Sequence, residues 1–257
     1  MNFMQRALLP SLNITPTPTP EFHNHKRTMS SSFQRFYDTW LEQLRQLVQQ
    51  LRQAPVPPTT EEQRQQLRQL VQKAISHYAE YYRSKAVGAK SDVLGFFSAP
   101  WTSTLERSLH WIGGWRPTTA FHLVYTESSI LFESHVIDIL RGYHTGDLGD
   151  LSPAQFRRVS ELQIQTVQRE NDITDQLCDW QDEATEIVGI RYAGVDVKME
   201  KLAAILEKAD ELRMKTIKSL VELLTLQQAA EFLVAAADLQ FGIRAWGIQQ
   251  DRQRNHN

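Results

Sequence analysis

The side chains that most often carry out catalysis or bind metal ions are scattered along this chain, which has 8 His and a single Cys. His77 lies beside Tyr78, and His110 lies beside Trp111, which favours hydrogen-bonded structural roles for both histidines. The sequence has no His-Glu-x-x-His motif and no pair of Glu-x-x-His motifs, so the spacing typical of a metal site in a helical bundle is missing. These residue types therefore do not indicate an enzyme.

The composition narrows the class of protein. The 257 residues are 41% apolar and 23% charged, which is typical of a globular chain with one large core or two small ones. Its 28 Lys and Arg are balanced by 30 Asp and Glu, so the chain lacks the basic excess that binding a phosphate backbone over its whole surface requires. Cys178 has no disulfide partner and, two residues before Trp180, is expected in the core. No run of 18 apolar residues occurs, so no membrane contact is expected.

Aromatic side chains gather in three short segments, residues 33–40, 77–82 and 100–117. Most of them are expected to pack in the core, whereas aromatic side chains left exposed are typical anchors of protein interfaces. Glu106 and Arg116 flank one short helix and loop in the third segment. We expect these two side chains to form a buried or half-buried ion pair that helps to determine the fold.

The elements that must position these segments are helical. Apolar residues recur at steps of three and four along residues 36–51, until Pro55 ends this first helix. Four later helices begin at cap signals, which are Thr59-x-x-Glu62, Ser103-x-x-Glu106, Ser152-Pro153 and Thr225-x-x-Gln228. Another helix is expected from about Thr118 to Arg141, and no strand-like alternation occurs. The sequence predicts an all-α, antiparallel bundle of about seven helices, some of them long.

The ends of the chain are predicted to lie outside this bundle. The run Thr15-Pro16-Thr17-Pro18-Thr19-Pro20 favours an extended conformation and is expected to stay out of any helix. Residues 1–32 are therefore predicted to form a disordered tail, residues 33–252 one helical domain, and residues 253–257 a disordered end.

Several motifs at these places resemble the plant Delay of Germination domain, which also forms the C-terminal half of TGA transcription factors. The motifs are Phe36-Tyr37-x-x-Trp40, Trp101-x-Ser103-x-Leu105-Glu106, Trp111-Ile112-Gly113-Gly114-Trp115-Arg116-Pro117, Leu148-x-x-Leu151-Ser152-x-x-Gln155, Gln228-Ala229-x-x-Phe232-Leu233 and Trp246-Gly247 followed by Asp251-Arg252. The resemblance covers about residues 33–252. It implies that the residues from Trp101 to Pro117 in these motifs build the fold or line a pocket.

The resemblance implies regulation rather than catalysis. The first 32 residues lack a basic run and heptads, so the chain resembles a member without a leucine zipper. The founding dormancy proteins bind type 2C protein phosphatases of the abscisic-acid pathway through a Tyr and Trp segment in the first helix. Tyr37 and Trp40 match that segment, although Asp38 and Thr39 between them depart from its pattern. Trp40 falls on the apolar stripe of the helix, whereas Tyr37 is offset by one position and is expected to be exposed.

The cofactor expected from the family does not match this sequence. The founding proteins are associated with haem through two histidines in the last helix, and Gln240 and Arg244 stand in their places. Neither is an ordinary axial ligand, so we expect no haem and predict no catalytic, cofactor-binding or metal-binding residues.

The sequence favours a regulator of seed dormancy, abscisic-acid signalling or development that acts in the nucleus or the cytoplasm through protein partners such as type 2C phosphatases. One alternative is a TGA-type transcription regulator that reaches specific DNA directly or through basic leucine zipper partners. A further alternative is a binder of an apolar small molecule between helices. Association with a second copy of the chain stays open.

Overall fold

The computed structural model describes residues 20–183 and 193–256, and within these ranges it contains helices and no strand. The helices are α1 (Pro20–Gln53), α2 (Glu61–Ala89), α3 (Val93–Ser98), α4 (Thr104–Ser108), α5 (Thr118–Leu140), α6 (Pro153–Asp182), α7 (Ala193–Leu223) and α8 (Leu226–His256), with a 3₁₀ turn, η1 (Leu148–Asp150), before α6. The predicted all-α bundle is confirmed. The described helices number eight rather than about seven, because the six-residue α3 was not predicted.

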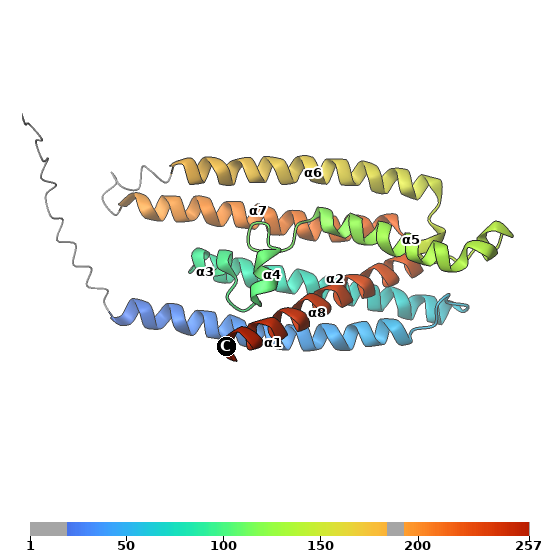
Figure 1. The fold of residues 1–257 in the computed structure, drawn as a ribbon, viewed down its shortest axis with the longest axis horizontal. Helices are drawn as coiled ribbons and strands as arrows, with labels where there is room; N and C mark the ends of the chain where they lie inside the picture. Colours follow the sequence, from blue (N-terminus) through green and yellow to red (C-terminus); the bar gives the residue numbers. More distant parts are fainter. Residues whose placement is uncertain (1–19, 184–192, 257) are drawn as a thin grey trace, which may run out of the picture.

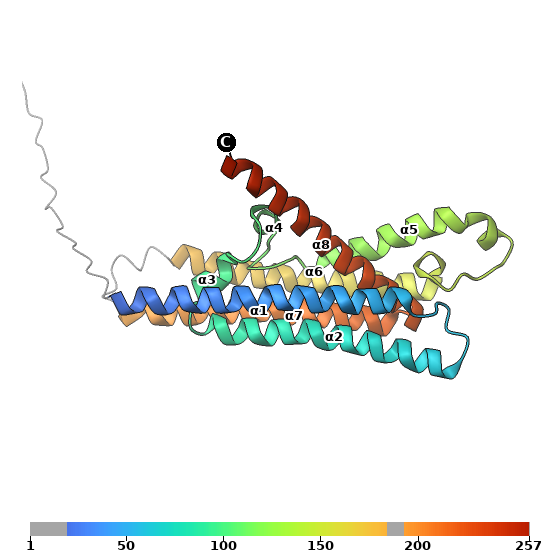
Figure 2. The same ribbon diagram turned by 90° about the horizontal axis from the view of Figure 1, so that it is seen from below.

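Four long helices, α1, α2, α6 and α7, lie along a common axis, with α7 between α6 and α2 and with neighbouring helices running in opposite directions (Figure 1). Helix α8 crosses this layer obliquely and packs against α1, α2 and α4 (Figures 1 and 2). Helix α5 leaves the bundle at one end, so that its C-terminal half projects away from the long helices (Figure 2). None of the described helices is both long and apolar enough to cross a membrane.

The beginning of α1 differs from the prediction. The helix begins at Pro20, so residues 20–32, which the sequence placed in the tail, are helical. Proline is compatible with the first turn of a helix, where its missing N–H leaves no hydrogen bond unmade, and neither Pro nor Gly follows it before Phe33. The rest of the predicted tail, residues 1–19, lies outside the described residues. At the other end α8 continues to His256, so residues 253–256, which were predicted to be disordered, are helical.

The cap signals fix most of the other helix starts. Ser103 and Ser152 each form a reciprocal capping box with the residue three positions later, and the Gln228 side chain accepts a hydrogen bond from the Thr225 backbone N–H at 2.9 Å. Helix α2 begins one residue later than predicted. Its N-cap is Thr60, whose box partner is Gln63, so the Thr59-x-x-Glu62 prediction was wrong by one position.

The core lies where α1, α2, α5, α7 and α8 meet. Its fully buried side chains include Leu44, Leu67, Phe121, Leu206, Leu220 and Phe232. Burying one such Leu or Phe contributes roughly 1.5–3 kcal/mol relative to leaving it exposed. Cys178 is exposed on α6, so its predicted place in the core was wrong.

Candidate functional site

The Trp111–Pro117 motif forms a tight turn and the start of α5. The Trp111 N–H donates a hydrogen bond of 2.7 Å to the Gly114 carbonyl, and the two residues between them have positive φ, 47° at Ile112 and 66° at Gly113. These angles are those of a type I′ turn, in which glycine is favoured because it has no Cβ. A Cβ on Gly113 would lie 2.8 Å from the Leu206 side chain, so both conformation and space require glycine there.

Two buried cations hold this turn by its carbonyl groups. The Arg213 guanidinium donates hydrogen bonds to the carbonyls of Trp111, Ile112 and Trp115, and the Lys85 ammonium donates one of 2.8 Å to the Gly113 carbonyl. Arg213 and Lys85 are 0% and 1% exposed, and they share the Asp210 carboxylate. A Cβ on Gly114 would come within 3.0 Å of the guanidinium carbon. The second glycine therefore leaves room for the cation that fixes the turn.

The tryptophan side chains of this motif link it to two helices. The Trp111 indole N–H donates to Thr174 Oγ1 on α6 at 3.0 Å, and the Trp115 indole N–H donates to the Tyr82 hydroxyl on α2 at 2.8 Å. Each indole thus keeps its polar group paired while its ring packs among apolar neighbours.

The end of the motif is hydrogen-bonded to Glu170 on α6. The Glu170 side chain is fully buried and accepts hydrogen bonds from Arg116 Nε at 2.7 Å and from the Thr118 N–H at 2.6 Å. The second bond provides an acceptor for a backbone N–H group in the first turn of α5, after Pro117. Glu106 has a different cationic partner, because its carboxylate lies 3.5 Å from Arg244. The predicted ion pair between Glu106 and Arg116 was therefore wrong.

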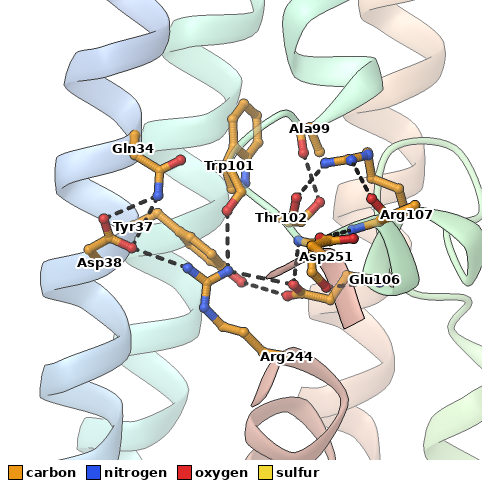
Figure 3. A network of polar contacts seen from close by, with 12 residues as sticks. Gln34, Tyr37, Asp38, Ala99, Trp101, Thr102, Glu106, Arg107, Arg244 and Asp251 are labelled. Carbon is orange, nitrogen blue, oxygen red and sulfur yellow. Dashed lines mark hydrogen bonds and ion pairs between the residues drawn. The ribbon is translucent and has the colours of Figure 1, made fainter. Parts of the chain in front are cut away.

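Arg244 occupies the centre of a network that joins α1, α4 and α8. It donates hydrogen bonds to Asp38 on α1 at 3.2 Å and to the Trp101 carbonyl at 3.1 Å (Figure 3). Its guanidinium carbon lies 5.0 Å from the centre of the Tyr37 ring, a cation–π distance. The Tyr37 hydroxyl points at Glu106 across 3.5 Å (Figure 3). Trp101 itself is buried between Phe33 and Phe96.

Tyr37 and Trp40 are core residues in this structure. Their side chains are 3% and 2% exposed, so the expectation that Tyr37 is exposed was wrong. The Trp40 indole N–H donates a hydrogen bond of 2.9 Å to the His77 carbonyl. In return, His77 Nε2 forms a hydrogen bond of 2.9 Å with the Trp40 carbonyl, and the two rings stack. This reciprocal contact fastens α1 to α2, and it confirms the structural role expected for His77.

An apolar cavity of about 300 Å³ opens between these elements. We call it the aromatic cavity, and its aromatic lining is Tyr37, Trp40, Tyr78, Tyr81, Tyr82, Trp115 and Phe232. Polar groups at its wall come from Thr102, Glu106, His110, Arg116 and Gln240. Residues that the sequence singled out in three separate segments thus meet at one cavity. Gly113 and Gly114 lie on its wall, whereas Trp101, Trp111 and Pro117 do not line it.

Burial governs the ionisation of two groups near the cavity. It lowers the pKa of His110 to about 4, and the nearby cations Lys85 and Arg213 act in the same direction. It also lowers the pKa of Lys85 to about 8, against the opposing attraction of Asp210. His110 is therefore neutral at physiological pH and can serve as a hydrogen-bonding group.

The residues at the two positions where the resemblance implies haem-ligating histidines do not fit that role. Gln240 lines the aromatic cavity but has an amide in place of an imidazole, and Arg244 already holds Asp38, Glu106 and the Trp101 carbonyl. Within residues 20–183 and 193–256, no three His, Cys, Asp or Glu side chains gather as a metal site would require.

Sequence reasoning missed the buried ions Lys85, Asp210 and Arg213. A signal was present, because Asp210 and Arg213 fall at helical spacing within the apolar stripe that runs from Leu206 to Leu220. A charged residue in the register of a core stripe indicates a buried polar contact, although its partner cannot be read from the spacing.

The chain is similar in sequence to known plant proteins. Residues 43–126, which include the turn motif, match the family described as "Seed dormancy control". The chain is 29% identical to Protein DOG1-like 4 of Arabidopsis thaliana over 86% of its own length and 94% of that protein. It is 28% identical to Protein ZW2 of the same plant, over 85% and 97% of the two chains. It is also 28% identical to Transcription factor TGA3 of Arabidopsis thaliana, over 88% of this chain and 56% of TGA3.

The described residues form an all-helical fold, and the part from residue 43 to residue 126 matches the seed dormancy control family. The resemblance found in the sequence is confirmed as a similarity: the chain resembles Delay of Germination-like proteins over most of its length, and it resembles the TGA transcription factors over about half of theirs.

Proposed function

We propose that this chain is a non-enzymatic regulator that acts through protein partners in seed dormancy, abscisic-acid signalling or development, in the nucleus or the cytoplasm. The observation that carries the proposal is the extent of similarity, which spans nearly all of Protein DOG1-like 4 and of Protein ZW2. The first candidate partners are type 2C protein phosphatases, which the founding dormancy proteins bind through the first helix.

The partner surface that we propose is the exposed side of α1 beside Tyr37 and Trp40. Since these two aromatic side chains are buried, they support the helix from within. Asp38 and Thr39 between them are exposed, and Arg244 fixes Asp38 at one edge of this surface. A partner would therefore contact Asp38 and Thr39, while Tyr37 and Trp40 hold the segment in place.

Titration calorimetry with a purified plant type 2C phosphatase tests this proposal. Thr39→Arg places a bulky cation on the surface, whereas Gln49→Arg places the same side chain on an exposed position of α1 three turns away. We expect Thr39→Arg to weaken binding by roughly tenfold or more, with an unchanged melting temperature, and Gln49→Arg to bind like the wild type. If Thr39→Arg and Gln49→Arg bound the phosphatase with equal affinity, the surface at Asp38 and Thr39 would not be the partner contact.

The TGA-type alternative is supported by the similarity to Transcription factor TGA3. In that case the chain would reach DNA together with a basic leucine zipper protein. Affinity capture from seed extract, followed by mass spectrometry, separates the two classes of partner. Recovery of phosphatases without zipper proteins supports the first proposal, and the reverse result supports the alternative.

A second candidate function rests on the aromatic cavity. Its volume of about 300 Å³ reaches the lower end of the range of small-molecule sites, and its wall is apolar apart from a few polar groups. We propose that an apolar small molecule could occupy it and act as an effector. Native mass spectrometry of the purified chain should then show a bound mass that disappears in Ala236→Phe, which fills the cavity. A single unliganded mass for the wild type would contradict this candidate.

A further inference from the structure

The mouth of the aromatic cavity carries exposed apolar side chains. Leu109, after α4, and Leu239, on α8, line the cavity and are 55% and 40% exposed. Trp246 follows Leu239 by seven residues, so it lies on the same side of α8, and it is 57% exposed. We call these three residues the mouth patch. A Trp side chain exposed beside the mouth of an apolar cavity is typical of a surface that another group covers.

The mouth patch is presented by elements that are held in place. Figure 2 shows the C-terminal half of α8 rising away from the layer of long helices, with α4 beside it. Gly247, next to Trp246, packs so closely on the N-cap of α4 that a Cβ there would lie 2.2 Å from Ser103 Oγ. Asp251 accepts a hydrogen bond of 2.9 Å from the Thr104 N–H at the start of α4. The exposure of Trp246 is therefore not that of a loose helix end.

The residues that precede α1 include a segment of matching chemistry. Two apolar pairs, Phe3-Met4 and Leu8-Leu9, occur within residues 1–9, and Arg6 is the one charged side chain before Pro20. Covering an apolar surface with apolar side chains is favourable, and a segment with a single charge leaves little charge to desolvate. Residues 1–9 therefore suit the mouth patch.

The length of the chain before α1 allows this contact. Tyr37, which lines the cavity, lies 17 residues after Pro20, so about 26 Å along α1 separate the cavity from the beginning of the helix. Residues 10–19 include three prolines, which favour an extended chain, and at about 3.1 Å per residue these ten residues can span about 31 Å. Helix α8 runs from the end of α1 back toward its beginning (Figure 1). The two apolar pairs are thus within reach of the mouth patch.

We propose that residues 1–9 fold back over the mouth patch of their own chain and cover it with their two apolar pairs. The link through residues 10–19 makes the contact intramolecular, so that a contact too weak to hold a separate peptide is sufficient. The covered state closes the aromatic cavity, and a ligand has to displace the segment in order to enter. Residues 1–9 thereby act as an internal inhibitor of the cavity. The inference does not depend on the effector considered above, because the surface that is covered is the mouth patch itself.

Photo-crosslinking of the full chain tests the contact directly. Phe3 is replaced by p-benzoylphenylalanine, the chain is irradiated at low concentration, and crosslinked peptides are identified in the monomer fraction by mass spectrometry. We expect crosslinks to the peptides that contain Leu109, Leu239 or Trp246, and none of these from the same label at Thr17, the matched control. Crosslinks to the mouth patch that occur only between two copies would overturn the proposal, and so would crosslinks that are the same for both labels.

Access of a dye to the cavity gives a second readout. The dye 1-anilinonaphthalene-8-sulfonate fluoresces on exposed apolar surface, and its fluorescence should rise roughly threefold or more when Leu8→Asp and Leu9→Asp are combined. Thr15→Asp combined with Thr17→Asp adds the same charges to the linking residues and should leave the fluorescence at the wild-type level. Adding Ala236→Phe, which fills the cavity, should abolish the rise. Circular dichroism checks that the helix content of each variant is that of the wild type. Equal fluorescence of the wild type and of the Leu8 and Leu9 variant would contradict the proposal.

Discussion

Tyr37 and Trp40 show how a residue's surroundings decide its role. The sequence places Tyr37 one position away from the stripe of Trp40 and Leu44, which predicted exposure. In the structure α1 is covered by both α2 and α8, so its buried face is wider than one stripe and includes Tyr37. Helical periodicity finds the apolar side of a helix, but the number of neighbours that cover it depends on contacts distant in sequence.

The first prediction concerns these two aromatic residues. Tyr37→Ala and Trp40→Ala should each lower the free energy of unfolding by about 3–5 kcal/mol, because each leaves a cavity in the core. Thr39→Ala, at an exposed position between them, should change it by no more than about 0.5 kcal/mol. Urea unfolding monitored by circular dichroism measures all three. Losses below about 1 kcal/mol for both aromatic variants would show that the two side chains are not core residues.

The second prediction concerns His110. Its pKa is lowered from 6.5 to about 4 in the folded chain, chiefly by burial. Between these two values the unfolded chain binds a proton that the folded chain does not, so stability is lost as pH falls from about 6.5 to about 4. The loss from this residue should be about 1–3 kcal/mol. His110→Asn should reduce the slope of unfolding free energy against pH in this window, and an unchanged slope would contradict the assignment.

At the scale of elements, the turn at residues 111–114 depends on ions from two helices. Lys85 on α2 and Arg213 on α7 bind its carbonyls, and a network from α8 holds α4 beside it. Ser103 and Ser152 were predicted correctly as N-caps because a cap bonds within three residues of itself. The cationic partner of Glu106 was not predicted correctly, because Arg244 lies far along the chain and several arginines could have paired with Glu106.

The third prediction compares two glycines. Gly113→Ala should destabilise the chain by about 1–3 kcal/mol, since φ is +66° and the new Cβ would press on Leu206. Gly242→Ala in α8 is the control, because nothing lies within 4 Å of its Cβ position. This change should stabilise the helix by about 0.5–1 kcal/mol. Thermal unfolding of both variants gives the comparison, and shifts of the same sign would contradict this account of the turn.

At the scale of the whole molecule, the overall class could be predicted from composition and periodicity, because long helices and their caps are local features. The aromatic cavity could not, since it depends on how α8 crosses the other long helices (Figure 1). The family motifs indicated which residues belong together, but not that Tyr37, Tyr82 and Trp115 share one wall.

The fourth prediction concerns nucleic acid. With a net charge of −2, the chain alone should bind duplex DNA weakly and with no preference between a TGA-type site and a scrambled sequence. A mobility-shift assay near physiological salt measures this. Clear discrimination between the two duplexes would support the alternative of direct, sequence-specific DNA binding.

The central claim is that this chain regulates through a protein partner that contacts α1. The most direct measurement is the affinity of the wild-type chain and of Thr39→Arg for a purified type 2C phosphatase, with both chains verified as folded. The account predicts saturable one-to-one binding that Thr39→Arg weakens by roughly tenfold or more. Absence of binding by the folded wild type would contradict the phosphatase assignment.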